Sequence, residues 1–142
     1  GFISPQTVFL APDPDTTITD PSTTLLPISV SAYDAENGSL YIHSSRGYTR
    51  SGEIKPELAA PGVGISAVAK NGSLTSVTGT SAGAAALLVD WRLEGNPRHL
   101  MTSSELKNFL IRGAGRSRDL TYPNRSWGYG TLNVYGVFES LL

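Results

Sequence analysis

The sequence changes character near residue 80. Before this point, short apolar runs alternate with proline and glycine, a pattern typical of brief strands joined by turns. After it, SAGAAALLVDWRLEG (81–95) is rich in Ala and Leu and contains no proline, which favours a helix that ends at Gly95. Because its apolar residues occupy several sides, we expect this helix to be buried. Strands followed by a buried helix favour an α/β layer structure over a β-sandwich.

The composition excludes several classes of protein. A length of 142 residues is enough for one domain with a hydrophobic core, so we treat 1–142 as one unit. Eleven basic and twelve acidic residues give a net charge of −1, so we expect neither nucleic acid nor a membrane as a partner. The sequence has no run of about 18 apolar residues. It has no cysteine, which excludes a disulfide framework and a zinc-thiolate site.

The chain before the Ala-rich helix divides into a lead-in segment and several short strands. Prolines with a run of Asp and Thr predict that residues 1–24 are irregular, with little helix. Apolar, β-favouring runs predict strands at 26–33, at 40–43, on both sides of a bend at Pro61 and Gly62, and at 73–79.

Two further helices are predicted after the Ala-rich one. Thr102 or Ser103 can cap a helix over SELKNFLIRGA, with Glu105 in its first turn. The expected core face of this helix consists of Leu106, Phe109 and Leu110. GYGTLN (128–133) predicts a short β segment, and VYGVFESLL (134–142) predicts a terminal amphipathic helix.

The segment TGTSAGAAAL carries the chemical content of the sequence. A strand delivers Gly79, Thr80 and Ser81 to the first turn of the buried helix. Free backbone N–H groups and the positive end of the helix dipole can stabilise an oxyanion formed when a serine attacks a carbonyl. A serine at the start of an Ala-rich helix is also a common structural cap. The motif therefore indicates a nucleophile only together with other segments of the chain.

Those other segments resemble the subtilisin-like serine peptidase, or subtilase, family over residues 25–142. LLPISVSAYD (25–34) resembles the strand before the active-site loop, and HSSRGYTRSGEIKPELAAPGVGI (43–65) is similar to S-S-x-G…K-P-[DE]-[ILV]-x-A-P-G-x-x-I. WGYGTLNVYGVFESL (127–141) looks like the closing strand and last helix of the family. Within the family, the chain looks most like the bacterial Csp-type subtilases of spore germination.

The resemblance implies a fold and a role for each residue of the GTS motif. Ser81 is expected to be the catalytic nucleophile, and Gly79 and Thr80 to form its loop. The expected fold is α/β: the C-terminal part of a doubly wound parallel sheet, with the Ala-rich helix buried after the nucleophile. Protein or peptide is the expected substrate, and the upstream part of the same polypeptide is an expected partner.

The chain departs from the family pattern at the catalytic triad. Subtilases order the triad as Asp, His and Ser, and the first two, like the Asn of the oxyanion hole, lie upstream of the matched region. His43 lies in a segment that matches a late strand and loop, so we interpret it as a loop histidine. His99 follows Ser81, which breaks the family order, and is assigned no role.

A second departure lies directly after the nucleophile. Several residues usually separate G-T-S-x-A from A-G-A-A-A-L in the family, whereas here AGAAAL follows Ser81 at once. A deletion of about six residues would shorten the helix by about 9 Å. Without a gap, Ala82 replaces the usual Met, Gly83 the usual Ala and Ala85 the usual Pro. Either interpretation argues against normal activity.

Other residues give weaker signals. The spacing of Asp13, Asp15 and Asp20 fits no calcium loop, so we expect no specific metal and no cofactor, although calcium use stays open. Four basic residues form a local cluster; a solvated helix end explains the first of them at least as well as an anionic ligand would, and two aromatic residues beside glycines are interpreted as packing residues. These are Arg112, Arg116, Arg118 and Arg125, and Trp127 and Tyr129.

Three hypotheses for the function follow. The first is the C-terminal portion of a subtilisin-like endopeptidase, inactive as an isolated chain. The alternatives are a pseudoprotease or regulatory binding protein on the same fold, and a β-rich interaction module in which GTS is only a helix cap. If the chain is only the C-terminal part of a doubly wound sheet, one strand edge lacks its neighbour and apolar residues such as Leu26, Ile28 and Val30 should be exposed. We therefore expect a homodimer of the isolated chain. We expect a secreted, cell-surface or spore-associated protein, with the cytoplasm left open.

Overall fold

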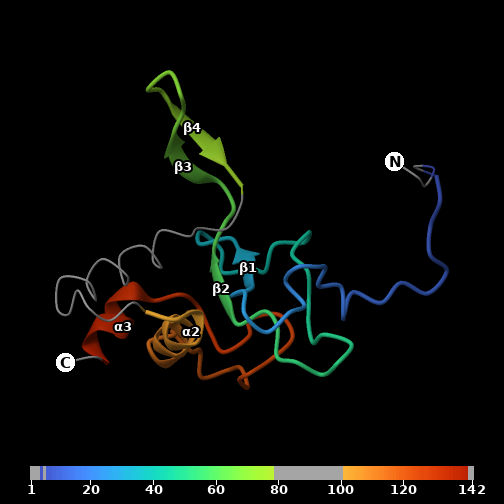
Figure 1. Ribbon diagram of the computed structural model, residues 1–142. Helices are drawn as coiled ribbons and strands as arrows, with labels where there is room; N and C mark the ends of the chain where they lie inside the picture. Colours follow the sequence, from blue (N-terminus) through green and yellow to red (C-terminus); the bar gives the residue numbers. More distant parts are fainter. Residues whose placement is uncertain (1–3, 5, 79–100, 141–142) are drawn as a thin grey trace.

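The computed structural model describes residues 4, 6–78 and 101–140 (Figure 1). The elements are β1 (Val30–Tyr33), β2 (Leu58–Pro61), β3 (Ile65–Val68), β4 (Leu74–Val77), α2 (Ser103–Arg112) and α3 (Val134–Glu139). The helix predicted from Ser81 onward lies outside the described residues, so that prediction is not tested. Neither α2 nor α3 is long and apolar enough to cross a membrane, and they are the helices of the described part.

Strand β2 is the middle one of three extended segments that run in parallel. On one side it pairs with β1, with Val30 opposite Leu58. On its other side, the amide of Ala59 donates to the carbonyl of Gly130 at 2.9 Å, and the amide of Leu132 donates to the carbonyl of Ala59 at 2.7 Å. The predicted parallel α/β arrangement is therefore present, and the 128–133 segment forms only a one-residue bridge within it.

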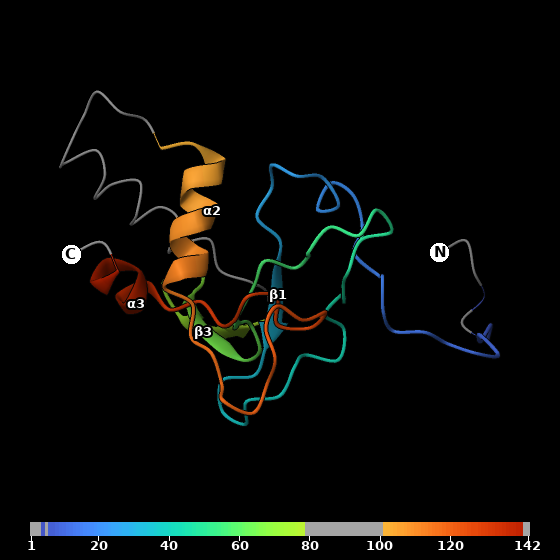
Figure 2. The same ribbon diagram turned by 90° about the horizontal axis from the view of Figure 1, so that it is seen from below.

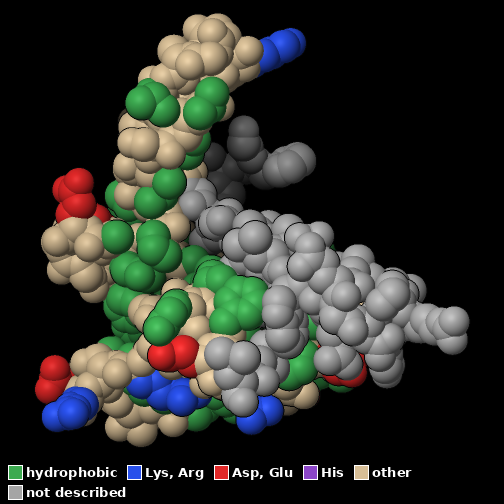
Figure 3. Space-filling model, turned by 90° about the vertical axis from the view of Figure 1, so that its left-hand side faces the viewer, with side chains coloured by type: hydrophobic (Ala, Val, Ile, Leu, Met, Phe, Trp, Pro, Cys, Tyr) green, Lys and Arg blue, Asp and Glu red, His purple; other side chains and the backbone are tan. Residues whose placement is uncertain are grey.

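Strands β3 and β4 form an antiparallel hairpin that projects from the body of the molecule (Figures 1 and 3). Ile65 lies opposite Val77, and Val68 lies opposite Leu74. The hairpin packs little, because the side chains of Val68 and Leu74 are 72% and 77% exposed. Short strands at both predicted positions are thus confirmed, and they lie on an arm.

Helices α2 and α3 lie together on one side of the molecule, and the lead-in segment extends to the other (Figure 2). Thr102 caps α2 with a complete capping box: its side chain accepts from the amide of Glu105, and the carboxylate of Glu105 accepts from the amide of Thr102. Leu110 packs with Leu58 of β2 and Val137 of α3 in the hydrophobic core. The predicted cap and core face of α2 are confirmed.

The predicted strand at 40–43 is wrong. Only Leu40 forms a bridge, to Tyr33, after which the chain turns. The hydroxyl of Ser44 accepts from the amide of Ala32 at 3.0 Å, so a side chain takes the place of a backbone partner. Ile42 is 85% exposed, so the apolar residues here do not face a core.

The prediction of three exposed apolar side chains holds for one of them. Leu26 is 71% exposed. Ile28 instead packs against the core cluster, and Val30 is half-buried in β1. The lead-in segment contains no helix or strand among its described residues, as predicted.

Candidate active site

The predicted nucleophile Ser81 and its neighbours Gly79 and Thr80 lie outside the described residues, so their roles stay predictions. The structure does show how the chain approaches them. Strand β4 ends at Val77, and the hydroxyl of the next residue, Thr78, accepts from the amide of Gly64 at 3.4 Å. The K-P-[DE] segment, β2 and the hairpin therefore form one continuous path to the GTS motif.

A buried carboxylate lies at the beginning of that path. The side chain of Glu57 is 3% exposed, and its Oε1 lies 2.6 Å from Nζ of Lys55 and 2.7 Å from Nζ of Lys107. Its Oε2 accepts from the amide of Ser29 at 2.7 Å. Lys55 is 2% exposed and Lys107 is 20% exposed. One carboxylate thus balances two cations and also bonds the chain at the start of β1.

Both lysines also bond the stretch between the lead-in segment and β1. Nζ of Lys55 donates to the carbonyl of Pro27, and Nζ of Lys107 donates to the carbonyl of Leu25, each at 2.6 Å. Carboxylate and carbonyl oxygens are the ligands that calcium prefers. Here the oxygens of Leu25, Pro27 and Glu57 are bonded to ammonium groups. Leu25, Glu57 and both lysines line part of a cavity of about 310 Å³ that extends toward Tyr129.

The sequence analysis missed this ion-pair network, although one signal was present. Lys107 lies three residues before Leu110, which places it on the core side of α2. Glu57 directly precedes the buried Leu58. A charged residue on each of two buried faces indicates a buried pair, because charges are buried only when they are paired.

The acidic residues of the lead-in segment have local partners. Oδ1 of Asp13 accepts from the amide of Asp15, whose carboxylate pairs with Arg125 at 3.0 Å. The carboxylate of Asp20 accepts from the hydroxyl of Thr23. Within the residues that the structure describes, no group of three His, Asp or Glu side chains is arranged to hold a metal.

His43 lies at an exposed turn, as interpreted from the sequence, with its ring 5.3 Å from the ring of Tyr41. It lines a cavity of about 260 Å³ together with Ser29 and Ser44. His99 lies outside the described residues.

Two of the basic residues have structural partners. Arg116 donates to the carbonyls of Tyr129 and Ile111, at 2.9 and 3.0 Å, and so bonds the last turn of α2. Arg125 stacks over the ring of Tyr48, 5.4 Å from its centroid.

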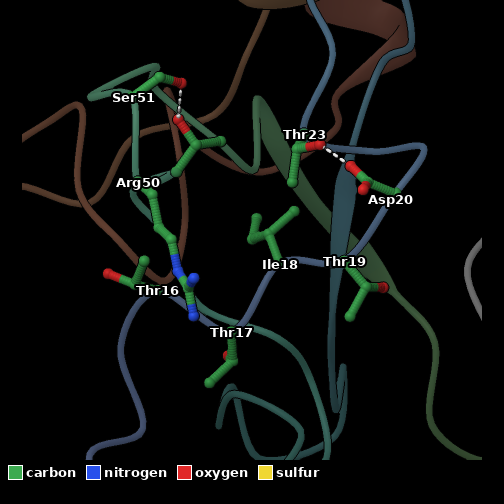
Figure 4. A pocket seen from close by; sticks show the side chains of 9 residues that line it. Thr16, Thr17, Ile18, Thr19, Asp20, Thr23, Arg50 and Ser51 are labelled. Atoms are coloured by element: carbon green, nitrogen blue, oxygen red, sulfur yellow. Dashed lines mark hydrogen bonds between the residues drawn. The ribbon is translucent and has the colours of Figure 1, made fainter.

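A larger pocket, of about 730 Å³, lies between the lead-in segment and the loop before β2 (Figure 4). Its lining is rich in hydroxyl groups, and the side chain of Arg50 extends toward Thr16 and Thr17 (Figure 4). Ser51 bonds Thr49 at 3.0 Å. The lining holds no histidine, and its one carboxylate, Asp20, accepts from the hydroxyl of Thr23.

The segments that resemble subtilases lie together in the structure. The K-P-[DE] segment and β2 lie beside the G-x-G segment, and the chain runs from β2 through the hairpin to the GTS motif. The Subtilase family model matches residues 11–130. The chain belongs to the subtilase family. The predicted family and α/β fold are therefore confirmed.

Solved structures give the same result. The chain is similar to the Clostridium perfringens CspB protease, with 33% identity and a TM-score of 0.85 over 95% of this chain and 31% of that one. It is also similar to the patellamide maturation protease PatA, with 25% identity and a TM-score of 0.64 over 85% of this chain and 45% of that one. The prenylagaramide maturation protease PagA shares the fold, with 24% identity and a TM-score of 0.69 over 92% of this chain and 48% of that one.

The chain thus spans about a third of the length of the CspB protease. The likeness to CspB agrees with the predicted similarity to Csp-type subtilases. Comparison with curated proteins gives no match.

Proposed function

We propose that this chain supplies the nucleophile of a subtilisin-like serine endopeptidase, with Ser81 as the attacking residue. The observation that supports this most is the path from β2 through the hairpin to Thr78, immediately before the GTS motif. The same strand is held between β1 and the G-x-G segment, which fixes it on both sides.

In this proposal, Oγ of Ser81 attacks the carbonyl carbon of a peptide bond while a histidine takes its proton. The C–N bond then breaks, the amine leaves with that proton, and water hydrolyses the acyl-enzyme. The histidine and the aspartate that orients it come from sequence upstream of the matched region, as the triad order of the family requires. The 142 residues by themselves are therefore inactive.

The proposed substrate is protein or peptide. The likeness to the CspB protease supports a Csp-type subtilase of spore germination, and hence a secreted, cell-surface or spore-associated protein.

Labelling with a fluorophosphonate probe tests the proposal. A polypeptide that carries this chain together with the Asp- and His-bearing part of a subtilase should be labelled at Ser81, and Ser81→Ala should abolish the labelling. The isolated chain should stay unlabelled. His43→Ala should label like the unchanged protein, because His43 is exposed at a turn.

Two results would contradict the proposal. No labelling of the longer polypeptide, when it is folded and binds peptide, would favour the pseudoprotease alternative. Labelling of the isolated chain at the rate of an active hydrolase would show that the base lies within these 142 residues.

A further inference from the structure

We propose that the pocket between the lead-in segment and residues 49–51 binds a carboxylate of a peptide, and that Arg50 recognises this group. The pocket has a volume of about 730 Å³, and all of its lining residues lie in the described part of the chain (Figure 4). A peptide is inferred as the ligand because the proposed function has a peptide substrate, and to this extent the inference rests on that function.

The two walls of the pocket are bonded to each other. The amide of Thr17 donates to the carbonyl of Arg46 at 2.8 Å, and the amide of Arg46 donates to the hydroxyl of Thr17 at 2.9 Å. The amide of Thr16 donates to the carbonyl of Gly47 at 3.1 Å. These bonds join the lead-in segment to the chain just before Thr49, so the pocket is formed without a ligand. A preformed pocket costs little ordering entropy when a ligand binds.

Thr16 has an unusual backbone conformation in the wall of this pocket. Its φ is +57°, and it is the one residue other than glycine with a positive φ in the described part of the chain. A β-branched residue rarely adopts this conformation, which persists only where surrounding bonds hold it. The bonds of Thr16 and Thr17 to residues 46 and 47 do so here. Because strained backbone gathers at binding sites, this wall is a candidate for contact with a ligand.

Arg50 brings unused hydrogen-bond donors to the pocket. Its side chain extends toward Thr16 and Thr17 (Figure 4). Within the described residues it makes no ion pair and no side-chain hydrogen bond, whereas Arg116 bonds two carbonyls. A guanidinium has five N–H donors in one plane and binds a carboxylate through two parallel hydrogen bonds. The hydroxyl of Thr16 also has no partner in the described part, so it adds a further donor at this end.

The charges of the lining are separated. Asp20 is the one acidic residue of the lining, and its carboxylate accepts from the hydroxyl of Thr23. Asp20 and Thr23 lie on the other side of the pocket from Arg50 (Figure 4). The Arg50 end is therefore positive and favours an anionic group. The volume falls within the range of about 300–1,000 Å³ that is typical of ligand pockets, so the pocket has room for a peptide segment that carries the carboxylate.

NMR titration of the ¹⁵N-labelled 142-residue chain tests the inference. The probe is the peptide acetyl-Ser-Glu-Glu-Ser-amide, and acetyl-Ser-Gln-Gln-Ser-amide is the matched peptide without a carboxylate. We expect the Glu peptide to shift the side-chain Nε–H signal of Arg50 and the amide signals of Thr16 and Thr17. Its dissociation constant should be at least about 10-fold lower than that of the Gln peptide. Tighter binding of the Gln peptide once its carboxyl terminus is free would identify a terminal carboxylate as the group that is bound.

Arg50→Gln should weaken binding of the Glu peptide about 10- to 100-fold. Arg50 is exposed and has no partner in the described part, so the fold should persist. Arg50→Lys should recover only part of the loss, because lysine lacks the planar pair of donors. Arg118→Gln is the matched control: it removes the same charge from an exposed residue outside the lining, so the Glu peptide should bind as it does to the unchanged chain.

Three results would overturn the inference. The first is equal binding of the Glu and Gln peptides, both with amide ends, when the free carboxyl terminus adds nothing. The second is equal weakening by Arg50→Gln and Arg118→Gln, which would show attraction by net charge alone. The third is a shift of the Arg50 signal by inorganic phosphate alone that is as large as the shift by the Glu peptide, which would show a general anion site.

Failure of the proposed function gives a different result, because the titration measures binding and requires no hydrolysis. If the longer polypeptide is not labelled at Ser81 but the Glu peptide binds at Arg50, only the proposed catalytic function fails. If Ser81 is labelled but Arg50→Gln binds the Glu peptide like the unchanged chain, only the inference about the pocket fails.

Discussion

The amide of Tyr129 donates to the carbonyl oxygen of Glu57 at 2.8 Å, so the G-x-G segment is bonded to the K-P-[DE] segment immediately before β2. The two segments are far apart in the sequence and both resemble subtilase motifs. Their backbones can come this close because Gly128, at the start of the G-x-G segment, has no side chain to meet the carbonyl oxygens of Pro56 and Glu57. Glycine is needed at position 128 because the two hydrogen-bonded backbones leave no room for a Cβ there.

Gly128→Ala should therefore destabilise the protein strongly. Gly128 has φ of +55°, and a Cβ at this position would lie 2.2 Å from the carbonyl oxygen of Pro56. The left-handed conformation costs about 1–2 kcal/mol for a residue with a Cβ, and the overlap adds about 1–3 kcal/mol. Urea unfolding measures the sum. Gly38→Ala is the control, because φ is +72° there but no atom lies within 4 Å of the added Cβ. Equal losses in the two variants would show that the overlap is relieved by backbone movement.

Glu57→Gln should lower the free energy of unfolding by about 3–5 kcal/mol, since two ammonium groups then lose their counter-charge in a site nearly closed to water. Thermal and urea unfolding measure this. Asp15→Asn breaks a pair whose side chains are 33% and 49% exposed, and should cost no more than about 1 kcal/mol. A loss for Glu57→Gln as small as that of Asp15→Asn would mean that water enters the network.

Thr102→Ala should cost about 1 kcal/mol, because it removes the side-chain half of the capping box of α2. Ser104→Ala lies in the same first turn and should change stability little. Circular dichroism melts of the two variants give the comparison, and identical melting temperatures would show that the cap is replaced by water.

The features that could be predicted from the sequence depend on neighbours along the chain. The cap at Thr102 with Glu105 and the core face of α2 follow from spacing within one helix. The bend at Pro61 and the short strands on both sides of it follow from turn residues between short β-favouring runs, whereas the pairing of β3 with β4 was not predicted. The family segments add the order of these elements, which is why the parallel arrangement around β2 could be predicted as well.

The features that were missed depend on contacts between distant parts. The strand predicted at 40–43 gives way to a turn because Ser44, through its side chain, bonds Ala32. Ile28 was expected to be exposed, but the core cluster that contains Leu58 and Leu110 covers it. Lys55 lies two residues from Glu57, but the other partners, Ser29 and Lys107, come from the start of β1 and from α2, so no local pattern shows all of them together. The GTS motif lies outside the described residues, and its predicted role stays a prediction.

The isolated chain should self-associate, with a dimer as the preferred state. Within the described residues, no further strand pairs with β3 or β4, so both edges of the hairpin are open. Such a ribbon is marginal alone, and open edges seek another strand. Leu74 on the hairpin is 77% exposed and gains most from being covered. Light scattering at micromolar concentration should therefore give a mass near twice that of one chain.

Leu74→Lys places a charge on the hairpin without disturbing the core, since the side chain is exposed, and should shift the mass toward that of a monomer. Leu120→Lys is the control: Leu120 is 44% exposed in a loop away from the hairpin, so the dimer should persist. A compact, stable monomer for the unchanged chain would show that these 142 residues need no partner at the hairpin. A dimer that both variants leave intact would mean that association uses another surface, of which the exposed Leu26 is the next to test.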